Sequence, residues 1–589
     1  MASEAVAQQF EVLSITGSVE VGGEGEPKHE LMLREKLTPS SFLNVPFKAK
    51  IELLDEKKRV MYTIKTPGYA TLGSMVANKQ NSVLRLTEQY LSYLKTRLKG
   101  KGELTSRKYS DPATVTREVV VKRNDYEEEF NAFRQQAQAE YDAFRQQAIR
   151  EYADFVRKAW QEFGAQPPRP IPVIEEVPPV VMSEDSVKPI KAVRIAIEKK
   201  VLKLPKIDRQ PIPITPIQEQ KVDLADYVDF MFYGTPLRVR FTSAGLFSLS
   251  EPTPDAVADV FGRLAGQELN NTIRDCLELR IRYQLGDWAY LQMLDSLSQN
   301  CLTSKNEATL LMAYLFQQSG YKMRLGLQTD TLCLLYSSNH HVYGKPYFYI
   351  DHDDYYVYKY NSRKMSICEA AFPKEQPLSL FITEQPMLAE NSSEERTLRS
   401  VRYDDMSFTS VVNKNLIDFY SSYPTSMVDG NFLTRWGMYA NTPLDATISS
   451  TLLPALHEKL QGLSNLQAVE RLLNWVQTAF KYELDDVVWG DDRAFFAEET
   501  LYYPYCDCED RSILLSHLVR DLLGLKVVLV YYPGHLATAV CFGEDDVVGD
   551  YIDLNGKKYV VCDPTYIGAR VGQTMTNMDN QIAKVLLLE

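Results

Sequence analysis

The sequence lacks any long hydrophobic run and any excess of positive charge. No stretch approaches the roughly 18 consecutive apolar residues that a membrane span needs, which predicts no transmembrane segment. Asp and Glu number 78 against 65 Lys and Arg, and a net charge of −13 gives no general attraction for nucleic acid or anionic membranes. Of the 589 residues, 45% are hydrophobic and 24% are charged, which excludes a largely disordered chain. Such a length predicts three to five domains, at roughly 100–200 residues each.

A signal peptide and a cysteine scaffold are also missing. The first ten residues have neither a basic start nor an apolar core, so the chain is either cytoplasmic or a mature form with a substitute Met1. Because the first third has the layout of an envelope protein, we expect a periplasmic or cell-envelope location after signal removal, and a cytoplasmic one otherwise. The eight cysteines begin at Cys276 and are too sparse for a disulfide scaffold.

Three N-terminal regions are distinguished by their periodicity. Residues 1–75 contain alternating and β-branched runs with glycine turns, which predict a small β-domain. Residues 76–165 predict a helical hairpin with aromatic residues packed inward, because an eleven-residue repeat fills 124–163. The alternative for this repeat is a helix that binds a protein partner or a second copy. Residues 166–222 are rich in proline and predict an extended linker, with a short binding motif as the alternative.

A cysteine near the C-terminus stands at a predicted helix start. The segment Tyr505-Cys-Asp-Cys-Glu-Asp-Arg-Ser512 precedes an apolar helical stripe that stops at Gly524. Cys508 would therefore lie at the helix N-terminus, where unpaired backbone N–H groups favour the thiolate over the thiol. Cys508 is thus the candidate nucleophile.

Two further residues complete a possible catalytic trio. His535 begins one predicted strand, and Asp563 ends another. If these strands are neighbours, about 4.8 Å apart, Asp563 can reach the ring nitrogen of His535 that faces away from Cys508. This is the nucleophile, base and orienting acid of thiol catalysis, and the Cys508 N–H is a candidate oxyanion donor.

These motifs resemble the transglutaminase-like superfamily of papain-type cysteine enzymes over about residues 440–575. The resemblance implies that Cys508, His535 and Asp563 are the catalytic residues and that the reaction passes through a thioester. It also implies a second oxyanion donor upstream of the cysteine, for which Trp489 and Tyr505 are candidates. Glu499 is a candidate for positioning that segment. No metal or other cofactor is expected.

Other readings of the same residues stay open. Cys506 is an alternative nucleophile, although it lies outside the predicted helix. A zinc site is the second alternative, and its ligands would be Cys506, Cys508, Cys541, Cys562 and His535. Strand cysteines are more typical of apolar packing. His517, in mid-helix, is expected to pack or to face solvent.

An upstream segment matches the candidate catalytic region at an offset of 204 residues. Ser304 falls at the position of Cys508 and Thr331 at that of His535, and Tyr360 falls at that of Asp563 after one residue of slippage. None of the three can act as a base. A displaced base from His340 and His341 is the alternative.

The sequence therefore predicts a multidomain α+β protein. After the small β-domain and the helical hairpin come a degenerate transglutaminase-like domain at 223–385 and a catalytic one at 386–589. The expected function is cysteine-dependent hydrolysis of peptide or protein amide bonds. A peptidase is favoured because many bacterial proteins with this motif resemble peptidases. The alternatives are a protein-glutamine transglutaminase or deamidase and, from another class, a non-catalytic envelope scaffold or binding protein.

Overall fold

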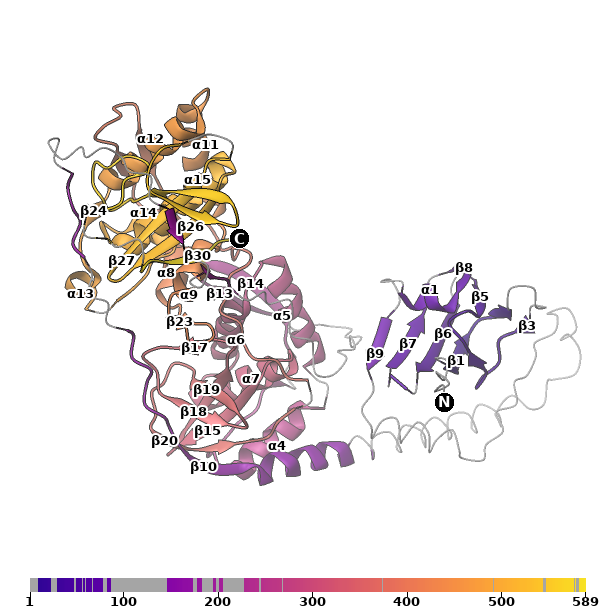
Figure 1. Ribbon diagram of the computed structural model, residues 1–589. Helices are drawn as coiled ribbons and strands as arrows, with labels where there is room; N and C mark the ends of the chain where they lie inside the picture. The colour runs from indigo at the N-terminus through magenta and orange to yellow at the C-terminus, as the bar shows by residue number, and fades with distance from the viewer. Residues whose placement is uncertain are drawn as a thin grey trace, which may run out of the picture. The chain divides into compact units, whose positions relative to one another are not determined.

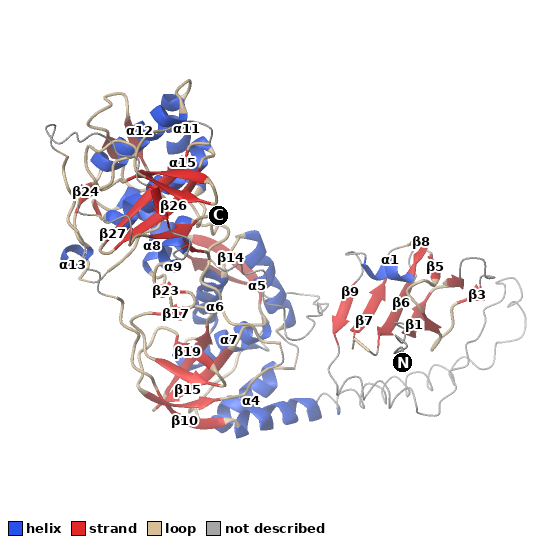
Figure 2. Ribbon diagram, in the orientation of Figure 1, coloured by secondary structure: helices blue, strands red, loops and turns tan. Residues whose placement is uncertain are grey.

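The computed structural model describes residues 9–85 and 146–589 with gaps, of which the longest are 183–193 and 205–226, together with Ala143 (Figure 1). The chain divides after Asn131 into two compact units. Helices and strands are mixed in the larger unit, which confirms the multidomain α+β class (Figure 2). Residues 124–142 of the eleven-residue repeat, with 144 and 145, lie outside the described residues. Among the described residues, no helix is both long and apolar enough to cross a bilayer.

The N-terminal unit is a small β-structure with one short helix. Its two sheets have the orders β4-β1-β6-β7-β9 and β3-β2-β5-β8. Alternate residues of β7 are buried, as the period of two predicts. The elements are β1 (Phe10–Thr16), β2 (Glu20–Gly22), β3 (His29–Glu30), β4 (Lys36–Leu37), β5 (Phe42–Val45), β6 (Lys50–Asp55), β7 (Val60–Ile64), β8 (Gly68–Thr71), α1 (Leu72–Ala77) and β9 (Ser82–Arg85).

The helical hairpin predicted for 76–165 is wrong at both ends. Helix α1 stops at Ala77, and Ser82–Arg85 form β9, which pairs antiparallel with β7. At the other end residues 146–158 are helical, but Trp160–Gly164 form strand β10, which pairs with β20. In both places an open sheet edge takes up the backbone hydrogen bonds, so pairing overrides the local helical pattern.

The larger unit contains two lobes. Lobe 1 comprises the described residues of 227–385 together with β10. Its elements are β10 (Trp160–Gly164), β13 (Tyr227–Phe232), β14 (Thr235–Arg240), α4 (Pro254–Leu264), α5 (Asn270–Arg282), α6 (Asp287–Cys301), α7 (Lys305–Gln318), β15 (Met323–Gln328), β16 (Thr331–Ser337), β17 (His341–Val342), β18 (Tyr347–Ile350), β19 (Asp353–Val357) and β20 (Lys364–Cys368). Its sheet has the order β10-β20-β15-β16-β19-β18.

Lobe 2 comprises the described residues of 386–589 with β11 and β12. Its elements are β11 (Arg194–Ala196), β12 (Val201–Leu202), β21 (Arg396–Arg399), β22 (Ser407–Ser410), α8 (Lys414–Ser421), β23 (Ser426–Met427), α9 (Thr434–Ala440), α10 (Ala446–Ser450), α11 (Leu452–Leu460), α12 (Asn465–Ala479), β24 (Lys481–Tyr482), α13 (Asp485–Val488), α14 (Ala497–Tyr502), β25 (Tyr505–Cys506), α15 (Cys508–Leu523), β26 (Lys526–Tyr532), β27 (His535–Cys541), β28 (Tyr551–Leu554), β29 (Lys557–Cys562) and β30 (Lys584–Leu587). Its sheet has the order β11-β28-β29-β27-β26-β30-β12.

The two lobes repeat one arrangement of strands. Read from the opposite end, the lobe 1 order β18-β19-β16-β15-β20 corresponds to β28-β29-β27-β26-β30 of lobe 2. The residue offset between β16 and β27 is 535 − 331 = 204, and that between β18 and β28 is 551 − 347 = 204. Strand registers agree as well, since Met323 pairs with Tyr336 as Val527 pairs with Val540. A central helix, α7 or α15, contacts the β15–β16 or β26–β27 hairpin in each lobe.

The proline-rich segment is more than a spacer. Besides supplying β11 and β12 as the outer strands of the lobe 2 sheet, it runs across the loops that precede His535 and follow Asp563. Val177 N donates to Gly534 O at 2.9 Å, and Met182 N donates to Ile567 O at 2.9 Å. We call residues 177–182 the strap. Because it holds both loops through backbone hydrogen bonds, it is part of the lobe 2 fold.

We expect Met182→Pro to lower the hydrolysis that the sequence predicts for lobe 2 about threefold to tenfold, since it removes one backbone hydrogen bond that holds the loop after Asp563. Val181→Pro is the matched control, because Val181 is 72% exposed and the bonds that hold the strap come from its neighbours. Steady-state rates of both variants check this. Equal rates in the two variants would contradict a positioning role for the strap.

Candidate catalytic site

Cys508 is the first residue of α15. The helix ends at Gly524, which adopts a left-handed conformation with φ of 65°. The cysteine side chain is 3% exposed, and its Sγ lies 3.2 Å from Glu509 Oε2, to which it donates. The location at a helix start places the sulfur in the partial positive field of the first backbone N–H groups.

His535 and Asp563 are hydrogen bonded, as the sequence predicts. His535 Nε2 lies 2.9 Å from Asp563 Oδ2. The other carboxylate oxygen accepts from the backbone N–H groups of Thr565 at 2.9 Å and Tyr566 at 3.2 Å, which fixes its orientation. Within the described part of the chain, His535 Nδ1 is buried without a hydrogen-bond partner. Nε2 of the imidazole is therefore held by Asp563, and Nδ1 is available to accept a proton.

Helix α15 and strand β27 are joined one helical turn from the cysteine. Ser512 Oγ, one turn after Cys508, donates at 2.9 Å to the backbone oxygen of Leu536, the residue after His535. The three side chains of the trio are closed to solvent, because Cys508 is 3% exposed and His535 and Asp563 are each 1% exposed. A substrate therefore reaches the thiol only when neighbouring side chains move.

An aromatic group lies beside the thiol. Burial raises the pKa of Tyr531, and the neighbouring Cys508 adds to this effect. Tyr531 is half-buried and packs against Phe432 and Trp436, with ring centroids 5.8 and 5.5 Å apart. Tyr531 is therefore part of an aromatic cluster at the thiol.

The loop that carries Asp563 is held by residues that the sequence reasoning missed. The buried Arg511 donates to Gln477 O at 3.1 Å, to Phe480 O at 2.9 Å and to Pro564 O at 3.4 Å. The side-chain amide of Gln477 in turn donates to Asp563 O at 3.0 Å. Arg511 belongs to the motif around the cysteine, so its presence was a signal, whereas nothing local identifies Gln477.

A second missed residue is the buried Arg435. Its Nη2 lies 2.6 Å from Asp492 Oδ2 and 3.6 Å from Glu509 Oε1. Because Glu509 is the carboxylate that contacts Cys508, Arg435 offsets a negative charge that would otherwise oppose thiolate formation. The carboxylates Asp492 and Glu509 raise the pKa of Arg435 above its ordinary value despite its burial.

Acidic side chains are concentrated around the start of α15. Three overlapping groups have ligand atoms within 4.8 Å of one another, and they are drawn from Asp485, Asp492, Asp507, Cys508, Glu509 and Asp510. Carboxylate-rich sets of this kind suit hard cations. None of these groups, in the described ranges, contains Cys506, Cys541, Cys562 or His535. The zinc set considered from the sequence therefore does not come together there.

Two of the other three candidates, Glu499 and Trp489, lie in one cluster. Glu499 is 2% exposed, accepts from Phe496 N at 3.1 Å and pairs with Arg493 at 2.6 Å. Burial raises its pKa to about 7. The guanidinium of Arg493 lies 4.8 Å from the Trp489 ring centroid, which ties Trp489 to Glu499. Tyr505 is 36% exposed. Among the described contacts, none joins Trp489 or Tyr505 to the trio, so neither gains support as an oxyanion donor.

Cys506, Cys562 and His517 are packed in the protein interior. Cys506 belongs to a different hydrophobic cluster from Cys508, and burial raises its pKa to about 11. Burial raises the pKa of Cys562, which lies in the core. His517 is packed within α15, and burial lowers its pKa.

In lobe 1 the counterpart of Asp563 is Lys359, and the one-residue slippage that led to Tyr360 is wrong. In lobe 2 Thr538 pairs with Cys562. Their counterparts at the offset of 204 are Leu334 and Tyr358, which are joined by a hydrogen bond from Tyr358 N to Leu334 O. The offset therefore holds to the end of this strand, and the next residue, Lys359, corresponds to Asp563. Ser304 precedes α7 and Thr331 begins β16, as expected. His340 is fully buried against Phe381, with its pKa lowered to about 3 by burial, and is not placed as a base.

Glu498 is a buried carboxyl whose protonation makes the stability of the protein depend on pH. Burial raises its pKa from 4.5 to about 8 in the folded protein. The folded state therefore retains a proton that the unfolded state releases, and stability falls as the pH rises from 4.5 to about 8. Glu498→Gln keeps an acceptor for Asp445 N, which lies 2.7 Å from Glu498 Oε1. We expect this variant to gain a few kcal/mol over the wild type across that range.

Urea unfolding at both ends of this pH range measures the gain. Glu458→Gln is the control, because Glu458 has a side chain that is 73% exposed. The same pH slope in wild type and Glu498→Gln would contradict a buried, protonated Glu498.

Comparison of the chain with protein-family models, curated proteins and solved structures finds no match. The case for the site therefore depends on its own geometry.

Proposed function

We propose that lobe 2 is a cysteine-dependent hydrolase of peptide or protein amide bonds that acts through a thioester acyl-enzyme. One observation carries this proposal: Asp563 holds His535 through Nε2 and leaves the buried Nδ1 unbonded, next to the helix that begins with Cys508. A buried imidazole with one oriented nitrogen and one available nitrogen is what a general base requires.

The proposed reaction uses these groups in order. His535 Nδ1 takes the proton from Cys508 Sγ, and the thiolate forms a bond to the carbonyl carbon of the scissile amide. The imidazolium then donates that proton to the leaving amine as the C–N bond breaks, which leaves a thioester. His535 next takes a proton from water, whose oxygen forms a bond to the thioester carbonyl carbon. The C–S bond breaks, the acyl group leaves as the carboxylic acid, and the imidazolium returns the proton to Cys508 Sγ. Backbone N–H groups at the start of α15 are the candidate oxyanion donors.

We further propose that the chain is a remote member of the transglutaminase-like superfamily with a degenerate upstream copy. The upstream copy is supported by the strand order and register that the two lobes share at an offset of 204 residues, and the family by the arrangement of Cys508, His535 and Asp563 that the resemblance implies. Lys359 stands in lobe 1 at the position of Asp563. A lysine ammonium donates hydrogen bonds but accepts none, so it cannot take the orienting role proposed for Asp563, which supports the loss of chemistry in lobe 1.

Hydrolysis, deamidation and amine transfer share the acyl-enzyme and differ in the acyl group and the acceptor. A peptide library is incubated with wild type, with and without a primary amine, and the products are identified by mass. Cleavage supports a peptidase. A gain of about 1 Da on glutamine supports a deamidase, and an amine adduct supports a transferase.

Two variants complete this experiment. Cys508→Ala is expected to abolish every product, and Cys506→Ala, the matched buried control, is expected to retain them. Products that persist in Cys508→Ala, or no product from wild type, would reject the proposal.

A further inference from the structure

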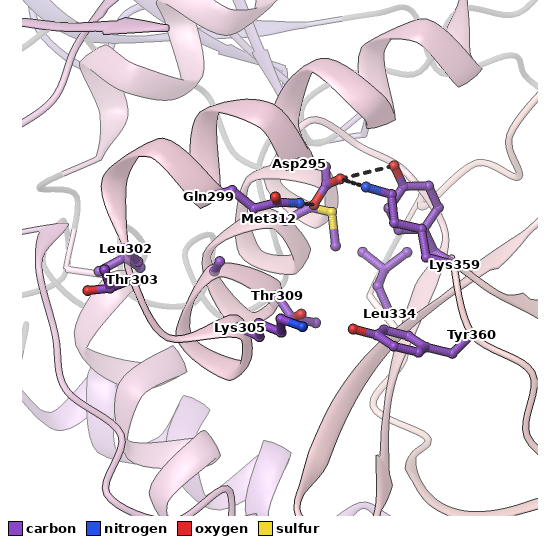
Figure 3. A pocket seen from close by; sticks show the side chains of 12 residues that line it. Asp295, Gln299, Leu302, Thr303, Lys305, Thr309, Met312, Leu334, Lys359 and Tyr360 are labelled. Carbon is purple, nitrogen blue, oxygen red and sulfur yellow. Dashed lines mark hydrogen bonds and ion pairs between the residues drawn. The ribbon is translucent and has the colours of Figure 1, made fainter. Parts of the chain in front are cut away.

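Lobe 1 contains a cavity of about 380 Å³ that the proposed thiol chemistry does not use. It lies between the C-terminal half of α6, the first turns of α7 and the residues after β19 (Figure 3). Leu302, Met312 and Leu334 contribute apolar side chains to its wall. In Figure 3 the Tyr360 ring stands across the cavity from Lys305 and Thr309.

The two lobes differ in this region. In lobe 2 the corresponding region, between the end of α12, the start of α15 and the loop after β29, is spanned by the buried Arg511. At the offset of 204 its lobe 1 counterpart is Glu307, since 511 − 307 = 204. Glu307 is engaged elsewhere, because its Oε1 accepts from Leu249 N at 2.7 Å. Lobe 1 therefore has no guanidinium at the position of Arg511.

Of the charged side chains that line the cavity, only Lys305 has no partner of opposite charge among the described residues. Asp295 is already engaged, because it pairs with Lys359 and accepts from Gln299 at 2.7 Å and from Tyr358 at 3.3 Å. Lys305 is exposed, and in the described part of the chain it has no acidic partner. As the first residue of α7, it lies where backbone N–H groups add partial positive charge. Lys305 is therefore the lining cation that is open to an anionic ligand, while part of the cavity wall is apolar.

We propose that this cavity binds a small carboxylate with a short aliphatic body, with Lys305 as the partner of the carboxylate. The volume lies at the small end of the range for ligand sites and suits a ligand of one or two amino-acid residues. The apolar wall formed by Leu302, Met312 and Leu334 takes the aliphatic part. A highly charged anion such as phosphate gains nothing from that wall. The site is independent of Cys508.

Isothermal titration of the full chain with N-acetyl-L-leucine and N-acetyl-L-leucinamide tests the proposal. The two probes differ only in the carboxylate, and for about a dozen heavy atoms we expect millimolar affinity. Wild type should bind the acid about tenfold more tightly than the amide, which corresponds to one hydrogen bond to a charged group. Lys305→Glu should abolish this preference. Thr309→Trp, which fills the cavity, should abolish binding of both probes.

Two controls make the outcome decisive. Lys414→Glu changes another exposed lysine at a helix start, that of α8, and should bind the acid as wild type does. Cys508→Ala should also bind normally, so that failure of the thiol chemistry is distinguishable from failure of this site. Equal affinity for the two probes, no measurable binding, or unchanged binding in Lys305→Glu would overturn the proposal.

Discussion

Asp563→Asn should lower amide hydrolysis about 10³- to 10⁴-fold while leaving the fold intact, which is the usual scale for loss of the orienting acid in a catalytic triad. An asparagine keeps an oxygen for the N–H groups of Thr565 and Tyr566, so the local turn should be preserved. Its NH₂ group would face His535 Nε2 and donate to it. That donation forces the proton onto Nδ1, where it prevents the imidazole from accepting the proton of Cys508.

A second histidine–aspartate pair in the same lobe serves as control for Asp563→Asn. Asp521 Oδ2 lies 3.6 Å from His517 Nδ1 on α15, away from the candidate base. Asp521→Asn should retain full activity. Rates and thermal unfolding are measured on both variants. If Asp563→Asn keeps more than about a tenth of the activity with an unchanged unfolding temperature, Asp563 does not orient the base.

Cys508 should react with iodoacetamide up to about 100-fold faster than an ordinary thiol at pH near 6.5, because an unperturbed thiol is only about 1% ionised there. His535→Ala should bring its rate down to that of an ordinary thiol. Since access through the surrounding side chains is the same in both proteins, the ratio of their rates isolates the effect of the imidazole. Mass spectrometry of the alkylated peptide measures Cys508 directly.

The alkylation experiment also tests the non-catalytic alternative. Cys506 lies two residues away with its pKa raised to about 11 by burial, so it should stay unlabelled in both proteins and serve as an internal reference. If Cys508 reacts equally in wild type and His535→Ala, the imidazole does not activate it. Lobe 2 would then be a scaffold that retains the arrangement without the chemistry.

Local patterns were sufficient for the elements that carry the trio. The start of α15 at Cys508 and its end at Gly524 follow from the cap residues and the apolar stripe. The strand start at His535 follows from the Pro-Gly turn before it. The pairing of β27 with β29, on which the His535–Asp563 contact depends, was an assumption that the sheet order confirms. The offset to lobe 1 was also readable, apart from the slip at Tyr360.

Residues far apart in the chain were not predictable in this way. Arg435 and Gln477 carry no motif, and their roles come from packing that brings α9 and α12 to the start of α15. The proline-rich segment has the composition of a spacer, yet it completes both edges of the lobe 2 sheet. Open sheet edges accept any backbone that reaches them, so composition alone does not decide where such a segment lies.

By itself the sequence determined where the candidate catalytic helix and strands begin and end, because caps, turns and periodicity act within a few residues. Only the tertiary structure decided that His535 meets Asp563, that Glu509 is paired with Arg435 and that the trio is buried. The physical reason is that burial and charge pairing depend on neighbours in space.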